Sequence, residues 1–273
     1  MTGIPSAASA NRLGRGRVRT VSEPEPSARA RGYTRETALS LLNGFRLEHR
    51  GEPFALSLGV QRLVAFLAVH NRPVQRLFVA CHLWIDSSEQ HANANLRTAL
   101  WRLRQLDFPI VDSTRSQLSL AAGIVVDLHE SDAHARRLLQ RRSPAPDDLD
   151  PALLDGDLLP DWYDDWVLIE RERFRQLRLH ALELLCEDLA AAGFYAAAVE
   201  AGLACVSAEP LRESAHRALV RVHLAEGNPG EAIRQYKLYR KLVYDELGLA
   251  PSAELERLVE SLPVGDGVVT RRG

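Results

Sequence analysis

An internal repeat with a period of 34 residues, in the C-terminal half of this 273-residue chain, most restricts the folds open to it. Three residue pairs share this spacing: Gly193 and Gly227, Ala198 and Ala232, and Val199 and Ile233. A period of about 34 residues is typical of tetratricopeptide repeats, in which each unit is a helix–turn–helix. Small residues at the elbows let paired helices approach closely, and stacked pairs bury a continuous core. We therefore predict an all-α, tetratricopeptide-like domain, with Gly248 capping its penultimate helix.

The N-terminal half has a different pattern. Short extended runs near residues 38–57 are separated by Asn43-Gly44 and by Gly51, which favour hairpin turns. Three helices follow, the first with Ser57 as a plausible cap, over about residues 59–70, 74–84 and 90–106. Two apolar runs joined by the polar turn STRS then predict a β-hairpin. A small sheet, three helices and a closing hairpin indicate a winged helix-turn-helix, so the fold class is mainly α with a small β component.

The third of these helices carries the segment NANLRTALWRLR, residues 93–104. Leu96, Leu100 and Leu103 form an apolar stripe along one side. The segment contains no acidic residue, and its other side holds Asn93, Asn95, Arg97, Thr98, Trp101, Arg102 and Arg104. Arginine can bind guanine or phosphate through two parallel hydrogen bonds, and asparagine can do the same for adenine. We predict that this side enters the DNA major groove; the alternative is an ordinary surface helix with solvated arginines.

Two residues of the predicted interface leave alternatives open. Arg115 lies at the predicted tip of the wing, where it could contact a phosphate or remain a solvated turn residue. Trp101 is a bulky aromatic residue among polar neighbours. It could stack on a sugar or a thymine methyl group, or pack against a neighbouring element, and we expect packing before stacking.

The charge of the chain is strongly uneven, although its formal net charge is only −2. Residues 1–37 hold seven basic and three acidic side chains, and residues 38–122 hold nine and six. The remaining 151 residues hold 18 basic and 27 acidic side chains. Only the N-terminal half is therefore suited to a polyanion, which agrees with a DNA-binding role for that half.

The ends of the chain and its cysteines indicate a cytoplasmic protein. Residues 1–37 are rich in Ser, Ala, Pro and Arg, and we expect them to be disordered, with no signal peptide. No apolar run approaches the ~20 residues that a membrane helix needs. Cys81, Cys186 and Cys205 are widely spaced in apolar settings, so we expect three core thiols and no disulfide or metal cage.

No catalytic or cofactor site is predicted. His129 and His134 lie near Asp127 and Asp132, but a strand end and a helix start separate them, so a metal site is not expected. In the run DWYDDW, residues 161–166, the aromatic residues are expected to anchor a long helix and the carboxylates to favour its positive end. No serine–histidine–aspartate or cysteine–histidine arrangement has a recognisable context, and the glycine–lysine pair of a phosphate-binding loop is absent. We therefore expect no enzyme, cofactor or metal.

A second basic stretch lies in the C-terminal half. It consists of Arg171, Arg173, Arg175 and Arg178. Glu170 and Glu172 interleave with these arginines, so intrahelical ion pairs are expected in preference to contacts with flanking DNA.

Both halves together resemble a known family, the Streptomyces antibiotic regulatory protein type of transcriptional activator. In the first half, LLNGFRLEHRGEPFALSLGVQRLVAFLAVHNRPVQR, HLW and NLRTALWRLR stand in the order and spacing of that family. In the second half, GDLLPDWYDDWVLIERERFRQL and EPLRESAHRALVRVHLAEGNPGEAIRQYKLYRKLVYDELGLAPSAEL resemble the bacterial transcriptional activator domain. The resemblance covers roughly residues 39–262.

The resemblance implies a sequence-specific DNA-binding activator that reads direct repeats near promoters and recruits RNA polymerase, often through its sigma factor. It also implies a homodimer, at least on DNA, and a nucleoid-associated location. The expected organisation is a disordered tail, a winged helix-turn-helix, an activator domain and a flexible tail, over residues 1–37, 38–127, 128–262 and 263–273. The alternative function is a helical-repeat interaction adaptor whose winged helix binds protein, or binds DNA only nonspecifically.

Overall fold

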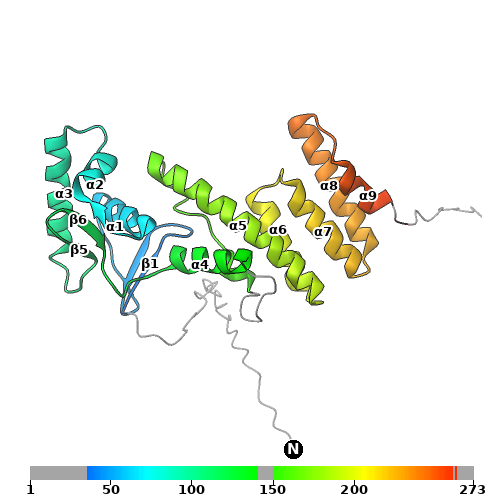
Figure 1. Ribbon diagram of the computed structural model, residues 1–273, viewed down its shortest axis with the longest axis horizontal. Coiled ribbons are helices and arrows are strands. Elements are labelled where there is room, and N and C mark those ends of the chain that lie inside the picture. Colours follow the sequence, from blue (N-terminus) through cyan, green and yellow to red (C-terminus); the bar gives the residue numbers. More distant parts are fainter. Residues whose placement is uncertain (1–35, 141–149, 261, 263–273) are drawn as a thin grey trace, which may run out of the picture. The chain divides into compact units, whose positions relative to one another are not determined.

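The computed structural model describes residues 36–140, 150–260 and 262 (Figure 1). The predicted C-terminal tail lies outside the described residues, as does the predicted N-terminal tail except for Glu36 and Thr37. The described chain is mainly helical with small sheets near its N-terminal end, which confirms the predicted fold class.

The first sheet has four short strands in the order β3-β2-β1-β7. The strands β1, β2 and β3 form an antiparallel meander, and β7 pairs with β1 in parallel. Their bounds are Thr37–Ser40, Arg46–His49, Glu52–Pro53 and Val125–Val126. Asn43-Gly44 and Arg50-Gly51 have positive φ at the two turns, as the sequence predicted for hairpins here. The third extended run forms a strand only at its start.

Three helices and a second sheet follow, which confirms the predicted winged helix-turn-helix order. The helices α1, α2 and α3 span Leu58–His70, Arg76–Leu83 and Glu89–Leu103. The wing consists of β5 and β6, and β4 extends its sheet in the order β4-β6-β5. These strands span Val74–Gln75, Val111–Ser113 and Gln117–Leu120. The second predicted hairpin run is split between the sheets, because Gly123, at a φ of 91°, turns the chain from β6 into β7.

From Asp127 onward, the described residues form helices and their connecting segments, with one isolated β-bridge from Leu158 to Leu42. The helix α4 spans Asp127–Gln140, and the short 3-10 helix η2 spans Pro151–Leu154. The helices α5, α6, α7, α8 and α9 then span Asp165–Ala191, Tyr195–Ala208, Glu213–Ala225, Pro229–Leu247 and Ala253–Glu260. The predicted repeat is confirmed. Gly193 and Gly227 lie at the elbows with φ of 81° and 84°, and Ala198 and Ala232 are fully buried just after them. Gly248 caps α8 in a left-handed conformation, as expected.

The start of α5 joins the core of the winged helix. Trp166, Val167 and Phe174 are buried in the same hydrophobic cluster as α1, α2 and α3. The Trp166 ring meets that of Phe66 edge-on, with centroids 5.1 Å apart. Asp164, just before α5, forms an ion pair with Arg62 of α1. Figure 1 shows α5 continuing from this contact to the stacked helices α6 and α7.

Asp127, the first residue of α4, fixes the other connection between the halves. Its carboxylate accepts hydrogen bonds from the backbone N–H groups of Leu41 and Leu42, at 2.8 and 3.1 Å, and from Leu128 at 2.7 Å. Burial of the side chain is the largest influence on its pKa, which is raised, although these three hydrogen bonds act in the opposite direction. The carboxylate therefore holds the end of β1 against the start of α4.

Two smaller expectations are corrected. Cys81 is exposed, whereas Cys186 and Cys205 are buried core thiols as predicted, and burial raises the pKa of both to about 12. Tyr163 is 80% exposed and does not anchor α5, because only Trp162 and Trp166 of that run turn toward the core.

Candidate nucleic-acid interface

The helix α3 is held by its apolar side, as its sequence predicted. Leu96, Leu100 and Leu103 are each at most 5% exposed, and Ala92 and Ala99 extend the same buried stripe. Ser88 caps the helix, because its hydroxyl accepts a hydrogen bond from the backbone N–H of His91 at 3.4 Å. The opposite side of α3 is therefore fixed in direction and faces solvent.

The polar residues of α3 fall into two rows with a ridge between them. A helix turns by about 100° per residue, so residues seven apart lie on one line. Arg97 and Arg104 form one row, and Asn95 and Arg102 form the other. The ridge consists of Thr98 and Trp101. All six of these side chains are exposed.

Asn93 and Thr98 are already engaged by their own helix. The Asn93 amide donates to the carbonyl oxygen of Glu89 at 3.0 Å, and the Thr98 hydroxyl donates to that of Ala94 at 3.0 Å. Asn93 is also partly buried. Asn95 is thus the more accessible of the two predicted asparagines.

Trp101 departs from our expectation. Its side chain is 61% exposed, so the prediction that it packs against a neighbouring element is wrong. The reason is its place in the helix, on the side opposite Leu96 and Leu103, where no neighbouring element covers it within the described chain.

Arg102 is linked to a different helix. Its Nη1 donates to the hydroxyl oxygen of Ser57 at 2.9 Å. Ser57 occupies the N-cap position of α1, as predicted, but its side chain makes no capping hydrogen bond there. The hydroxyl instead orients the guanidinium of Arg102 at the edge of the exposed face of α3.

The wing contributes one predicted arginine and lies beside a second that the sequence reasoning missed. Arg115 is exposed in the turn between β5 and β6, which Thr114 closes by accepting from and donating to Gln117. Arg76, at the start of α2, donates to the hydroxyl oxygen of Ser113 in β5 at 2.9 Å. The signal that could have indicated Arg76 is its position at a helix start directly after Pro73-Val74-Gln75.

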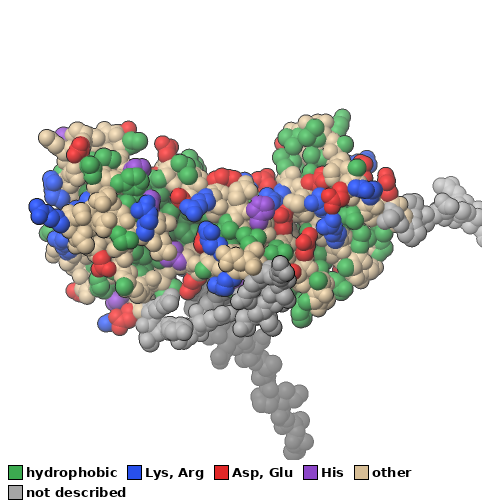
Figure 2. Space-filling view, in the orientation of Figure 1, with side chains coloured by type: hydrophobic (Ala, Val, Ile, Leu, Met, Phe, Trp, Pro, Cys, Tyr) green, Lys and Arg blue, Asp and Glu red, His purple; other side chains and the backbone are tan. Residues whose placement is uncertain are grey.

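The arginines of this surface differ from those of α5 in their partners. Within the described residues, Arg97, Arg104 and Arg115 form no ion pair. Figure 2 shows Lys and Arg side chains gathered at the edge of the molecule over α3. The surface therefore presents uncompensated positive charge, which favours binding to a polyanion.

The α5 arginines are instead used within the protein. Arg173 and Arg175 pair with Glu170 and Glu172 of their own helix, as predicted. The other two bind the preceding loop: Arg171 donates to backbone carbonyls of Leu158, Leu159 and Trp162, and the buried Arg178 donates to Gly156 and pairs with Asp157.

Two of the residues considered for a metal site, Asp127 and His129, bind backbone groups instead. Asp127 binds backbone N–H groups, and His129 donates from Nε2 to the carbonyl oxygen of Ala68 at 2.6 Å. In residues 36–140 and 150–260, no group of three His, Cys, Asp or Glu side chains is placed to hold a metal ion. None of the helices in these ranges has the length and apolar character needed to cross a membrane.

Comparison with known proteins places the chain in a family. The family model of the bacterial transcriptional activator domain matches residues 126–262, half of the chain. The chain belongs to this family. The match begins at Val126, the last residue of β7, and covers the helices α4 to α9 together with Asp127. Membership confirms the resemblance to activators of the Streptomyces antibiotic regulatory protein type.

Two relatives extend the likeness over the winged helix. Regulatory protein AfsR of Streptomyces coelicolor is 28% identical over 246 residues, which are 83% of this chain and 24% of AfsR. The chain thus spans about a quarter of the length of that relative. The structure of Mycobacterium tuberculosis EmbR in complex with a low affinity phosphopeptide matches with a TM-score of 0.64 at 19% identity. That match covers 82% of this chain and 64% of EmbR, and it shows a common fold.

Proposed function

We propose that this protein is a sequence-specific DNA-binding transcriptional activator, with residues 38–127 as the DNA-binding unit and residues 128–262 as the activator domain. The observation that carries the proposal is the exposed face of α3, with arginines that form no ion pair within the described chain. In winged helix-turn-helix proteins this helix enters the major groove. Membership in the activator-domain family supports the same role.

The two rows of α3 suggest how bases are read. Arg102 and Asn95 share one row but lie seven residues apart, which is about 10.5 Å along the helix axis. They can therefore bind a guanine and an adenine on different base pairs of the site, each through two hydrogen bonds. Arg97 and Arg104 on the other row can bind a second base or the phosphates. The exposed ring of Trp101 lies between the rows and can contact a thymine methyl group or a sugar.

Phosphate contacts would fix the register of the helix in the groove. Arg115 lies exposed at the wing tip, and Arg76 at the start of α2 donates to Ser113 of the wing strand β5. We assign both to the DNA backbone, because neither lies on the face of α3 that can meet base edges. Contacts of this kind add salt-sensitive affinity through counterion release.

We propose further that the activator domain recruits RNA polymerase, through its sigma factor, and that the protein binds direct repeats as a homodimer. This part of the proposal rests on the family resemblance and places the protein in the cytoplasm, on the nucleoid. Several large apolar side chains between the middle of α8 and the segment just after it are exposed and could serve a protein contact; they are Leu238, Tyr244, Leu247 and Leu249. The same observation favours the rival function, an interaction adaptor that binds DNA only nonspecifically.

Footprinting of the full chain on the DNA around its own gene, at physiological salt, tests the proposal. An activator protects a pair of direct repeats, and the protection survives an excess of unrelated competitor DNA. An adaptor gives weak binding to all sequences, which falls steeply as salt is raised. Protection that is lost to unrelated competitor DNA would reject the sequence-specific function.

A further inference from the structure

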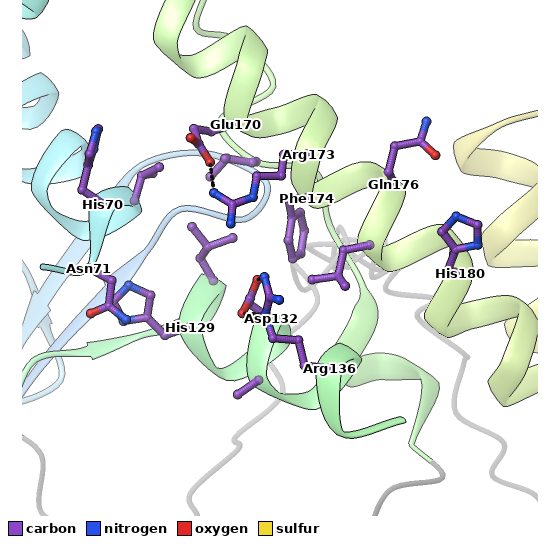
Figure 3. Close-up of a pocket in the computed structure, with 15 residues that line it drawn as sticks. His70, Asn71, His129, Asp132, Arg136, Glu170, Arg173, Phe174, Gln176 and His180 are labelled. Atoms are coloured by element: carbon purple, nitrogen blue, oxygen red, sulfur yellow. Dashed lines mark hydrogen bonds and ion pairs between the residues drawn. The ribbon is translucent and has the colours of Figure 1, made fainter. Parts of the chain in front are cut away.

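A pocket of about 600 Å³ lies where the winged helix meets the activator domain. Its walls come from the end of α1, the first turns of α4 and the first half of α5 (Figure 3). Sites for small molecules usually have volumes of roughly 300–1,000 Å³ and an apolar lining with a few polar groups. The pocket has the size of such a site, and no residue of the proposed DNA interface lines it.

The floor of the pocket is apolar. Leu128, Leu158 and Phe174 contribute to it, and each is less than 9% exposed because it also belongs to the core. Ala133 of α4 lines the same space with a small side chain, which leaves room above the floor. The three floor residues leave little carbon surface in contact with water, but Val69 and Leu177, which also line the pocket, are half-buried. An apolar group placed here would cover their exposed carbon surface.

The rim of the pocket carries two arginines from opposite helices. Arg136 of α4 pairs with Asp132 through two hydrogen bonds, at 2.6 and 3.1 Å. Arg173 of α5 has a single 3.4 Å contact with Glu170, which Figure 3 shows as a dashed line. A guanidinium has five N–H donors, so both arginines keep donors for a further acceptor.

His70, at the pocket wall, is held by its own helix α1. His70 donates from Nδ1 to the carbonyl oxygen of Phe66 at 2.8 Å, and its ring stacks on that of Phe66. Burial lowers the pKa of His70 below its ordinary value, which favours the uncharged ring. The guanidinium groups of Arg136 and Arg173 carry the positive charge of the rim, each beside one carboxylate, that of Asp132 or Glu170.

We propose that this pocket binds an amphipathic organic acid, with its apolar body on the floor and its anionic group held by Arg136 and Arg173. The pairing of a carboxylate or sulfonate with guanidinium donors is charge-assisted and directional. Such a ligand contacts α1 of the winged helix and α4 and α5 of the activator domain at once, so it stabilises one arrangement of the two. The site does not depend on the DNA-binding function proposed above.

Two fluorescent probes that differ only in charge test the site. 8-Anilinonaphthalene-1-sulfonate is an apolar ring system with an anionic group, and N-phenyl-1-naphthylamine is the same ring system without it. The full chain is titrated with each probe. We expect one saturable site for the sulfonate. Replacing both rim arginines, Arg136→Gln with Arg173→Gln, should weaken binding of the sulfonate by about tenfold or more and leave the neutral probe within about twofold.

Two further variants separate the pocket from other apolar surfaces. Ala133→Phe fills the space above the floor and should abolish saturable binding of both probes. Arg234→Gln is the matched control, because Arg234 forms an i,i+3 pair with Glu231 at 3.2 Å, like that of Arg173 with Glu170, but lies on α8 away from the pocket. It should change neither titration. Sulfonate binding that survives Ala133→Phe, or that ignores loss of the rim arginines, would overturn the proposal, as would the absence of saturable binding.

Discussion

The guanidinium of Arg102 in α3 donates a hydrogen bond to the hydroxyl oxygen of Ser57, which precedes α1 by one residue. The two residues are 45 positions apart in the sequence. The bond uses one of the five donors of the guanidinium, so the others remain for DNA. Ser57 thereby orients an arginine on the face that we assign to the major groove.

Replacing Arg102 by alanine should weaken specific operator binding by about 1–3 kcal/mol, if the side chain makes a two-bond contact with a guanine. Fluorescence anisotropy with an operator duplex, at fixed salt, measures the effect. Ser57→Ala should weaken operator binding less than Arg102→Ala does, because it removes the hydrogen bond that orients Arg102 and leaves the guanidinium in place. Arg234→Ala, on the exposed side of α8, serves as the control. Equal affinity of the Arg102→Ala variant and the unmodified protein would remove Arg102 from the interface.

Trp101→Ala should separate binding from stability. Because the ring is 61% exposed, its loss should change the free energy of unfolding by no more than about 0.5 kcal/mol. Leu100→Ala, one residue earlier and 5% exposed, should cost about 2–5 kcal/mol. Urea denaturation measures both. Operator affinity should fall for Trp101→Ala; a large loss of stability would instead mean that the ring is packed against another part of the chain.

Gly202, in the middle of α6, lies at a close contact between helices of the repeat region. An added Cβ would lie 2.8 Å from Leu219 Cγ on α7 and 3.2 Å from Cys186 Sγ on α5. Gly202→Ala should therefore destabilise the protein by about 1–3 kcal/mol, through overpacking. Gly230→Ala is a contrasting variant, since a Cβ there meets no atom within 4 Å. Thermal denaturation should show no decrease in melting temperature for Gly230→Ala and a clear decrease for Gly202→Ala. Equal melting temperatures for the two variants would contradict the close packing at Gly202.

His216 should make stability depend on pH. It is fully buried, donates from Nε2 to the carbonyl oxygen of Pro210 at 2.9 Å, and accepts from Gln235 at Nδ1. Burial lowers its pKa from the ordinary value of 6.5. The unfolded chain therefore binds a proton first as pH falls, so the free energy of unfolding is highest above about pH 7 and decreases through pH 6.5.

Urea denaturation at a series of pH values tests this dependence. His216→Gln keeps a polar side chain without a titrating ring, so its free energy of unfolding should fall less between pH 7.5 and 5.5 (about two units around the ordinary histidine pKa). Part of the decrease in the free energy of unfolding with falling pH should remain in this variant, because burial also lowers the pKa of His70. If the free energy of unfolding of His216→Gln falls with pH as steeply as that of the unmodified protein, groups other than His216 cause the pH dependence.

The sequence by itself determined the helices, their order and the exposed side of α3. These features are local: a helix turns by about 100° per residue, so Leu96, Leu100 and Leu103 define the buried side and hence the opposite one. The repeat was equally visible, because Gly193 and Gly227 need positive φ and recur at one interval.

Only the tertiary structure decided which distant segments meet. The bond from Arg102 to Ser57, the exposure of Trp101 and the burial of Trp166 against α1 all depend on how elements far apart in the sequence pack. Periodicity says which side of a helix is apolar, but it does not say which neighbour covers that side or where coverage ends. For the same physical reason, the pocket between α1, α4 and α5 has no counterpart in any single stretch of the sequence.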